Sequence, residues 1–244
     1  LTDEKKPLLA VRDLKVYYPI KVRSRGIFSQ KKLVRAVDGI SFDVYEGETL
    51  GIVGESGCGK STTGKTIVRL NRPTAGSVTY DGMDLFSCPP QAQARISREI
   101  QIVFQDPFGS LNPQMTVGEL FMEPLRKHRC GSGQEIRKQA AQMLETVRLS
   151  QRDAGKYPHE FSGGQRQRVA FASILAMNCY IYVIDEPTSQ LDPDGTEKVF
   201  QIISALKEQK KTVILVEHKI DLLAQYADEI LVIEKGSILK SGPT

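Results

Sequence analysis

Residues 50–62 read LGIVGESGCGKST, and this stretch decides the fold of the chain. It fits the pattern G-x-x-x-x-G-K-[ST], whose fixed positions are Gly54, Gly59, Lys60 and Ser61. The apolar run 49–53 predicts a buried strand, and Thr62–Leu70 predicts the helix that follows the loop. Strand, loop and helix together are the context that the pattern requires.

The chemistry of this loop suits phosphate. Its glycines let successive backbone N–H groups point inward without Cβ clashes, and the helix N-terminus adds partial positive charge. Lys60 can reach the β- and γ-phosphates, and the Ser61 hydroxyl can bind Mg²⁺. A glycine-rich turn without a ligand is the competing interpretation, and the GKS ending disfavours it. The candidate nucleotide-binding residues here are Gly54, Glu55, Ser56, Gly57, Cys58, Gly59, Lys60, Ser61 and Thr62.

Composition sets broad limits on the class of protein. The 244 residues suffice for one large or two small domains, and 40% hydrophobic with 25% charged residues is ordinary for a globular chain. A net charge of +4 is too weak to indicate nucleic-acid binding by itself. The four cysteines are far apart, so we expect neither disulfides nor zinc, and we expect a reducing compartment. No apolar run approaches the ~20 residues of a membrane span, and the first residues given are polar, so we expect neither a membrane span nor a secretory segment.

The first part of the chain predicts mainly strands. Leu8–Tyr18 alternates apolar and polar residues and is expected to end before Pro19, and Val34–Val44 resumes the alternation. Between them Lys21–Arg35 predicts a basic loop, either solvated or in contact with anionic lipid or nucleotide. Gly76–Tyr80 predicts another short strand before a turn.

A helical insertion is predicted from Ser87 to about Gln165. Ile100–Phe104 is a short strand within it, and Val117–Leu125 is a helix candidate. A capping box, in which a serine and a glutamate three residues later satisfy each other's backbone N–H groups, predicts a further helix start at Ser132.

The last third of the chain alternates strands and helices. Ser162 and Gln165 form a second capping box, which puts two glycines in the first turn of a helix. The later elements are predicted at Ile181–Ile184, Gly195–Gln209, Thr212–Val216, Ile220–Tyr226, Ile230–Ile233 and Ser237–Leu239. This alternation indicates an α/β fold with a mostly parallel, covered sheet.

Polar residues follow several of these strands. Asp185 suits a Mg²⁺ ligand and Glu186 suits a base that orients water, although an acidic turn cap would look the same. His218 also ends a strand, where a γ-phosphate contact competes with a structural role. Gln105 could touch Mg²⁺ or the attacking water. Tyr18 could stack on adenine or be a half-buried strand residue.

Taken together, these motifs resemble the nucleotide-binding subunit of the ATP-binding cassette (ABC) family. The resemblance covers nearly the whole chain, and six motifs in the family's order are very specific. They are Gly54–Ser61 as Walker A, Gln105 as Q-loop, Ser162-Gly163-Gly164-Gln165 as signature, Asp185-Glu186 as Walker B, Ser189-Gln190-Leu191-Asp192 as D-loop and His218 as switch histidine.

The resemblance implies a fold and an assembly. The fold is a P-loop NTPase (RecA-like) α/β core with an antiparallel β subdomain and an inserted α-helical subdomain. Residues 1–244 would form one ABC ATPase domain, with a core at 8–86 and 166–244 and the insertion at 87–165. Two such domains would enclose two ATP molecules with Mg²⁺. The nucleotide held by Lys60 of one copy would then be approached from the other copy by Ser162, Gly163, Gly164, Gln165 and Asp192.

The resemblance also implies a place in the cell and partners. These are the cytoplasmic face of the membrane, transmembrane permease subunits and a second ATPase subunit, identical or different, with no nucleic acid. The stretch 104–117 would line a groove for a permease helix, although Phe108, Leu111 and Met115 could equally be core of the insertion.

Two parts of the chain resemble different importer groups. Up to about residue 168 the sequence is similar to oligopeptide and dipeptide importer ATPases. After it, 189–193 and 216–222 look more like energy-coupling-factor ATPases, so a recombined or engineered chain joined near 165–180 is a hypothesis. The expected function is ATP hydrolysis that powers an importer, with peptides favoured. The competing interpretations are a soluble ABC ATPase of DNA repair or translation and a hybrid domain with uncoupled ATPase activity.

Overall fold

Two β-sheets organise the chain in the computed structural model, which describes residues 6–22, 30–104, 111–146, 149–175, 178–189 and 193–244. In this described part the larger sheet has the strand order β10-β9-β3-β8-β7-β6. Its strands are β3 Thr49–Val53, β6 Ile100–Val103, β7 Ile181–Asp185, β8 Thr212–Glu217, β9 Glu229–Glu234 and β10 Ser237–Pro243. All neighbouring pairs are parallel except β9 and β10. The predicted mostly parallel sheet is therefore confirmed.

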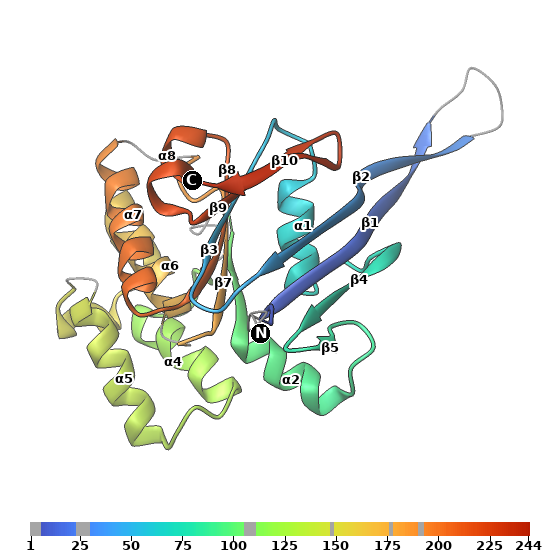
Figure 1. Ribbon diagram of the computed structural model, residues 1–244. Coiled ribbons are helices and arrows are strands. Elements are labelled where there is room, and N and C mark those ends of the chain that lie inside the picture. The colour runs from blue at the N-terminus through green and yellow to red at the C-terminus, as the bar shows by residue number, and fades with distance from the viewer. Residues whose placement is uncertain (1–5, 23–29, 105–110, 147–148, 176–177, 190–192) are drawn as a thin grey trace, which may run out of the picture.

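The second sheet is antiparallel and has the order β2-β1-β4-β5. Its strands are β1 Leu9–Val22, β2 Gln30–Val44, β4 Ala75–Tyr80 and β5 Met83–Asp84. β1 and β2 extend well beyond the rest of this sheet as a two-stranded hairpin (Figure 1).

This hairpin corrects two predictions. β1 continues through Pro19 to Val22, because β1 pairs with β4 only from Leu9 to Lys15 and beyond that has β2 as its described neighbour. Proline is tolerated at such an edge, where its missing N–H breaks no ladder. Most of Lys21–Arg35 is accordingly strand, with β2 beginning at Gln30; residues 23–29 lie outside the described chain.

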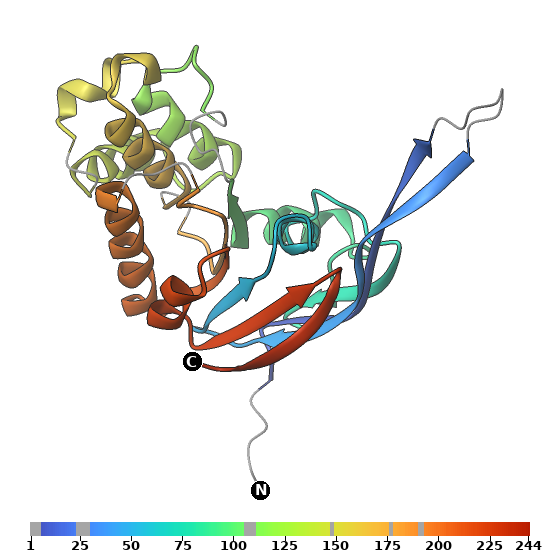
Figure 2. The same ribbon diagram turned by 90° about the horizontal axis from the view of Figure 1, so that it is seen from above.

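Helices cover both faces of the larger sheet. They are α1 Lys60–Ile67, α2 Pro90–Glu99, α7 Pro193–Glu208 and α8 Ile220–Tyr226. Viewed from above, α1 lies between the two sheets and α7 lies on the opposite face of the larger sheet (Figure 2). Because side chains alternate along a strand, Val183 of β7 packs toward α1 whereas Ile184 packs toward α7. β7, which ends at the candidate metal ligand Asp185, thus lies between two separate hydrophobic cores.

A third core belongs to the helices α4 Val117–Lys127, α5 Gly133–Thr146 and α6 Gly163–Leu175, together with the short 3₁₀ helices η1 Gln151–Gly155 and η2 Pro158–Glu160. Phe121, Leu144 and Val169 are buried here, one from each α-helix. Leu111 is buried in this core and Met115 packs against it, which supports the core interpretation for both, while Phe108 lies outside the described residues.

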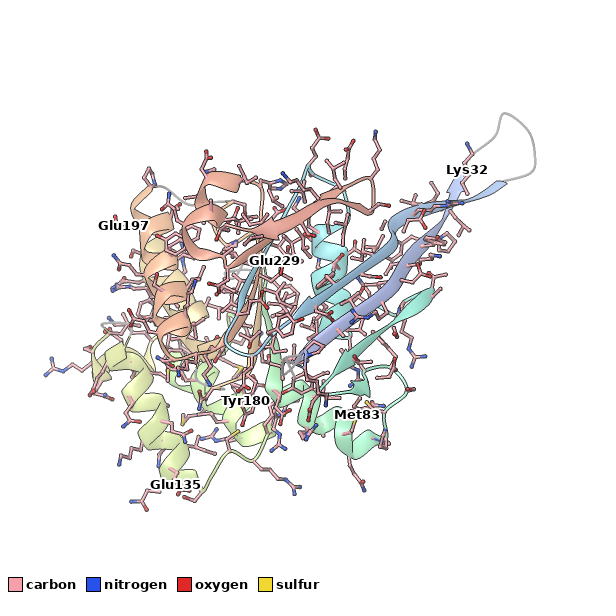
Figure 3. The ribbon with its side chains drawn as sticks, viewed as in Figure 1. Lys32, Met83, Glu135, Tyr180, Glu197 and Glu229 are labelled. Carbon is pink, nitrogen blue, oxygen red and sulfur yellow. The ribbon has the colours of Figure 1, made fainter. Side chains whose placement is uncertain are left out.

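Two elements of the predicted insertion, α2 and β6, pack with the sheets. α2 packs Ile96 into the core beneath the sheets, and β6 is a strand of the larger sheet beside β7. The sequence predicts a strand at Ile100–Phe104 but not the sheet that it joins, because pairing with a strand about 80 residues away leaves no local signal. In the stick view, Glu135 of α5 and Lys32 of the hairpin lie at opposite ends of the molecule (Figure 3). No helix among the described residues combines the length and apolarity that a membrane span needs.

Candidate nucleotide-binding and hydrolysis site

The loop between β3 and α1 has the shape that the glycine pattern predicts. A Cβ on Gly54 would lie 2.1 Å from the Ile233 carbonyl oxygen, and one on Gly59 would lie 2.2 Å from that of Ala36. Gly59 also has φ +113° and is the residue before α1. The helix therefore begins at Lys60, two residues earlier than predicted, and ends at Ile67, before the left-handed Arg69. The N–H groups of its first turn face the end of the loop.

The turn between β9 and β10 is hydrogen-bonded to this loop. The Gly236 N–H donates to the Cys58 carbonyl at 2.9 Å, and the Gly236 carbonyl accepts from the Asp38 N–H at 2.7 Å. Lys235 and Gly236 both have positive φ, as a tight hairpin turn requires. The sequence predicts this turn but gives no sign that it touches the loop.

Lys60 is buried, with only 3% of its surface exposed. Its ammonium donates to the carbonyls of Gly54 at 2.8 Å and Glu55 at 2.9 Å. Glu186 Oε1 lies 3.9 Å from the same nitrogen, and His218 Nδ1 lies 3.4 Å from it. A buried lysine at the centre of a loop of N–H groups supplies fixed positive charge for an anion.

Ser61 and Asp185 meet directly. The Ser61 hydroxyl donates to Asp185 Oδ1 at 2.7 Å, and Asp185 is buried at the end of β7. Their oxygens come from residues 124 positions apart, and both are hard ligands of the kind that Mg²⁺ prefers. The predicted pair is thus brought together, and its donor set fits the metal.

Glu186 and His218 form the other half of the site. His218 Nε2 lies 2.8 Å from Glu186 Oε1, and His218 Nδ1 lies 3.1 Å from the Gly54 carbonyl oxygen. Glu186 has a φ of +48°, and its N–H donates to the Val216 carbonyl at 2.9 Å. A left-handed backbone is costly for a glutamate and concentrates at functional sites.

Strand register explains why these residues converge. Val53 is paired with Glu217, and Asp185 with Val216, so the carboxyl ends of β3, β7 and β8 lie at one edge of the sheet. Ligands of α/β proteins bind outside such ends.

The remaining candidates lie elsewhere. Tyr18 is 39% exposed on β1, and its stacking on adenine stays a prediction. Ser162 is exposed and forms its predicted capping box with Gln165, at 3.0 and 3.4 Å, just before α6 opens with Gly163 and Gly164. Gln105 and Asp192 fall outside the described residues.

Glu217 is a residue of this region to which its sequence position did not assign a role. Glu217 is 2% exposed and accepts hydrogen bonds from the backbone N–H and hydroxyl of Thr188. The available signal was an acidic residue at the end of an apolar strand, the same signal that singled out Asp185.

With its buried lysine, serine–aspartate pair and glutamate–histidine pair, the site defines a nucleotide-binding P-loop protein.

Comparison with known proteins gives the family. Residues 37–189 match the family described as ABC transporter, and this chain belongs to it. The dipeptide transport ATP-binding protein DppF of Escherichia coli (strain K12) is 40% identical over 97% of this chain and 70% of its own length. The oligopeptide transport ATP-binding protein AppF of Bacillus subtilis (strain 168) is 39% identical over 96% of this chain and 71% of its own. The chain is accordingly an ABC ATPase.

Solved structures agree with this assignment. The dimeric post-hydrolysis structure of the ATP-binding cassette MJ0796 bound to ADP and Pi has a TM-score of 0.81 and 32% identity, covering 96% of this chain and 98% of that one. The cbiO1 structure from Clostridium perfringens, part of the transporter complex cbiONQ, has a TM-score of 0.79 and 26% identity, covering 97% and 88%. The hypothesis that the chain was joined near residues 165–180 stays a prediction.

Proposed function

We propose that this chain is the ATP-hydrolysing subunit of a peptide importer and that ATP drives closure of a dimer of such subunits. The observation that carries the proposal is the meeting of Lys60, Ser61, Asp185, Glu186 and His218 at one edge of the larger sheet. The peptide class is supported by the dipeptide and oligopeptide transport relatives. Residues 1–244 are proposed to form one ATPase domain.

Each of these side chains has a role in the proposed hydrolysis. Lys60 binds the β- and γ-phosphates, and a phosphate there replaces the carbonyls of Gly54 and Glu55 as its partner. Glu186 orients the attacking water and takes its proton, and its buried position beside Lys60 keeps its carboxylate directed at the loop. His218 holds that carboxylate through Nε2 and adds a contact to the γ-phosphate.

The Ser61–Asp185 pair would hold Mg²⁺. The proposal is supported by the 2.7 Å contact of two hard oxygen donors, both beside the loop that takes the phosphates. Bound there, the ion neutralises charge on the phosphate oxygens. Gln105 is proposed as a further ligand.

Dimer closure would bring the tip of α6 from one copy to the nucleotide of the other. Ser162 is exposed, and its capping box uses the N–H groups of Ser162 and Gln165. The N–H groups of Gly163 and Gly164, in the first turn of α6, have no partner within the helix and suit an incoming γ-phosphate. Glycines at the first two helical positions let the anion approach the backbone. The dimeric structure of the MJ0796 cassette bound to ADP and Pi supports a dimer of such domains.

The permease partner would dock on the helical part. An open hollow runs along α4, from the residues just before it to its last turn, lined by Gln114, Met115, Glu119, Glu123, Arg126 and Lys127. Its first two residues belong to the stretch 104–117, which the family resemblance assigns to this contact. The proposed location is therefore the cytoplasmic face of the membrane, bound to transmembrane subunits.

The experiment compares ATP hydrolysis by the wild-type protein and the Glu186→Gln variant. The amide cannot take a proton, so we expect hydrolysis to fall by roughly 10²–10⁴-fold while ATP affinity is retained. Glu197→Gln is a matched control, since Glu197 is an exposed glutamate of α7. Near-normal turnover by Glu186→Gln, or a wild-type protein without ATPase activity, would refute the proposal.

A further inference from the structure

Glu217 is a buried acid at this edge, and the proposed mechanism assigns it no role. Its Oε1 accepts the Thr188 hydroxyl at 2.7 Å and the Thr188 backbone N–H at 3.2 Å. Its Oε2 accepts the backbone N–H of His218 at 3.1 Å. One carboxylate thus joins the turn after β7 to the turn after β8, and both of these turns carry a residue of the proposed hydrolysis machinery.

The turn after β7 needs such support. Glu186 has its left-handed φ of +48°, and Ser189 N–H donates to the Glu186 carbonyl at 3.2 Å to close the turn. Strained backbone persists only where the surrounding structure over-determines it. Thr188 lies inside this turn, is 5% exposed, and has both of its donors on Glu217.

The turn after β8 is constrained by the same group. Because Oε2 of Glu217 accepts from the His218 backbone N–H, the backbone that carries the imidazole is fixed relative to Thr188. The other end of the imidazole lies on Glu186 Oε1 at 2.8 Å. A closed ring therefore runs from Glu217 to Thr188 by hydrogen bonds, along the chain to Glu186, across to His218 and back to Glu217.

We infer that Glu217 is a positioning residue: by binding Thr188 and the His218 backbone N–H, it fixes the distance between the Glu186 and His218 side chains. This inference rests on the proposed function, in which the Glu186–His218 contact orients the attacking water. Glu217 touches neither nucleotide nor water in this scheme, so its removal should lower the rate of hydrolysis while leaving ATP binding nearly unchanged. A misplaced catalytic group can cost about 10²-fold in rate.

The primary variant is Glu217→Gln, measured as kcat and KM for ATP. The amide nitrogen cannot accept, so one of the three hydrogen bonds is lost while side-chain volume is kept. We expect kcat to fall by roughly 10- to 100-fold with little change in KM. Thr212→Val is the matched control: it removes the hydrogen bond that the hydroxyl of the buried Thr212 accepts from the Gly47 N–H (2.9 Å) at the opposite end of the same strand. This control should lower stability without lowering kcat in the folded protein.

A double-mutant comparison separates positioning from general support. In a His218→Ala background the contact that Glu217 sets is already absent, so adding Glu217→Gln should lower kcat far less than it does in the wild type. An equal loss in both backgrounds, or an unchanged kcat in the single variant, would overturn the inference.

A pair of variants at Thr188 covers the case in which Glu217→Gln fails to fold. Thr188→Ser keeps the hydroxyl donor and should retain kcat, whereas Thr188→Val removes it and should lower kcat at similar KM. Equal rates in the two variants would overturn the inference. Hydrolysis by the wild-type protein separates the two proposals. If the wild-type protein does not hydrolyse ATP, the proposed function is refuted. If the wild-type protein is active and Glu217→Gln has the same kcat, only the role of Glu217 is refuted.

Discussion

His218 Nε2 lies 2.8 Å from Glu186 Oε1, although the two residues directly follow different strands and are separated by 32 positions in the chain. Through this contact Glu186, the proposed base, is held by His218, the residue proposed to bind the γ-phosphate. Because β7 and β8 are parallel neighbours in fixed register, the contact depends on the sheet and not on local sequence.

Replacing the histidine should impair turnover more than binding. His218→Ala removes one oriented group from the site, and loss of such a group typically costs about 10²-fold in kcat. ATP affinity, measured by equilibrium titration, should change much less. His159→Ala is the control, because His159 is exposed on η2 and stacks on Tyr157 away from the loop. Equal kcat in the two variants would remove His218 from the hydrolysis machinery.

Replacing the lysine should impair binding itself. Lys60→Ala deletes the buried ammonium, and a charge-assisted contact is worth about 1.5–3 kcal/mol, which corresponds to a roughly 10- to 100-fold weaker Kd for ATP. Lys65→Ala, on the last turn of the same helix, should bind as the wild type does. Isothermal titration calorimetry measures both. An unchanged Kd in Lys60→Ala contradicts the assignment of this residue to the phosphates.

Two glycines of the loop make a matched pair. At Gly59, with φ +113°, an alanine Cβ would lie 2.2 Å from a backbone oxygen, so the loop must move and ATP binding should be lost. At Gly57, with φ +78°, nothing lies within 4 Å of the Cβ, so Gly57→Ala should cost only about 1 kcal/mol of stability and retain binding. Thermal melts and ATP titrations separate the two. Similar binding by both variants would show that the close approach at Gly59 is not needed.

Asp153 should make stability depend on pH in the acid range. The Lys156 ammonium at 2.6 Å, with the Ser150 hydroxyl and N–H, holds the pKa of Asp153 at about 2. Since the folded-state pKa lies below the unfolded value of about 3.9, the stabilisation is present above pH ~4 and is lost as pH falls toward 2. Asp153→Ala should therefore lower the free energy of unfolding at pH 7 by about 1 kcal/mol, and by less at pH 3, in urea titrations. A difference that stays constant with pH would contradict this interpretation.

Local sequence rules predicted the parts of the site that depend on local structure. The loop glycines, the capping box at Ser162 and the acidic end of β7 all follow from chemistry within a few residues. They could be recognised because each requires a particular residue type at a fixed spacing.

Contacts between distant segments could not be predicted in this way. The sequence did not predict that β1 runs past Pro19, because residues 18–20 of β1 and 32–35 of β2 are exposed and a strand pair in water needs no apolar alternation. β6 joins the larger sheet through β7, and Glu217 reaches Thr188 across the edge of that sheet. Periodicity within a segment contains no information about which strand lies beside it, so these features required the structure.

The most direct test of the central claim is size-exclusion chromatography of the Glu186→Gln variant with and without Mg-ATP. If a γ-phosphate is bound by Lys60 of one copy and by the α6 tip at Ser162 of another, the variant should elute as a dimer with Mg-ATP and as a monomer without it. The additional change Ser162→Arg, at the exposed tip, should abolish the dimer while ATP binding persists. A variant that binds Mg-ATP yet stays monomeric at every concentration would contradict the account.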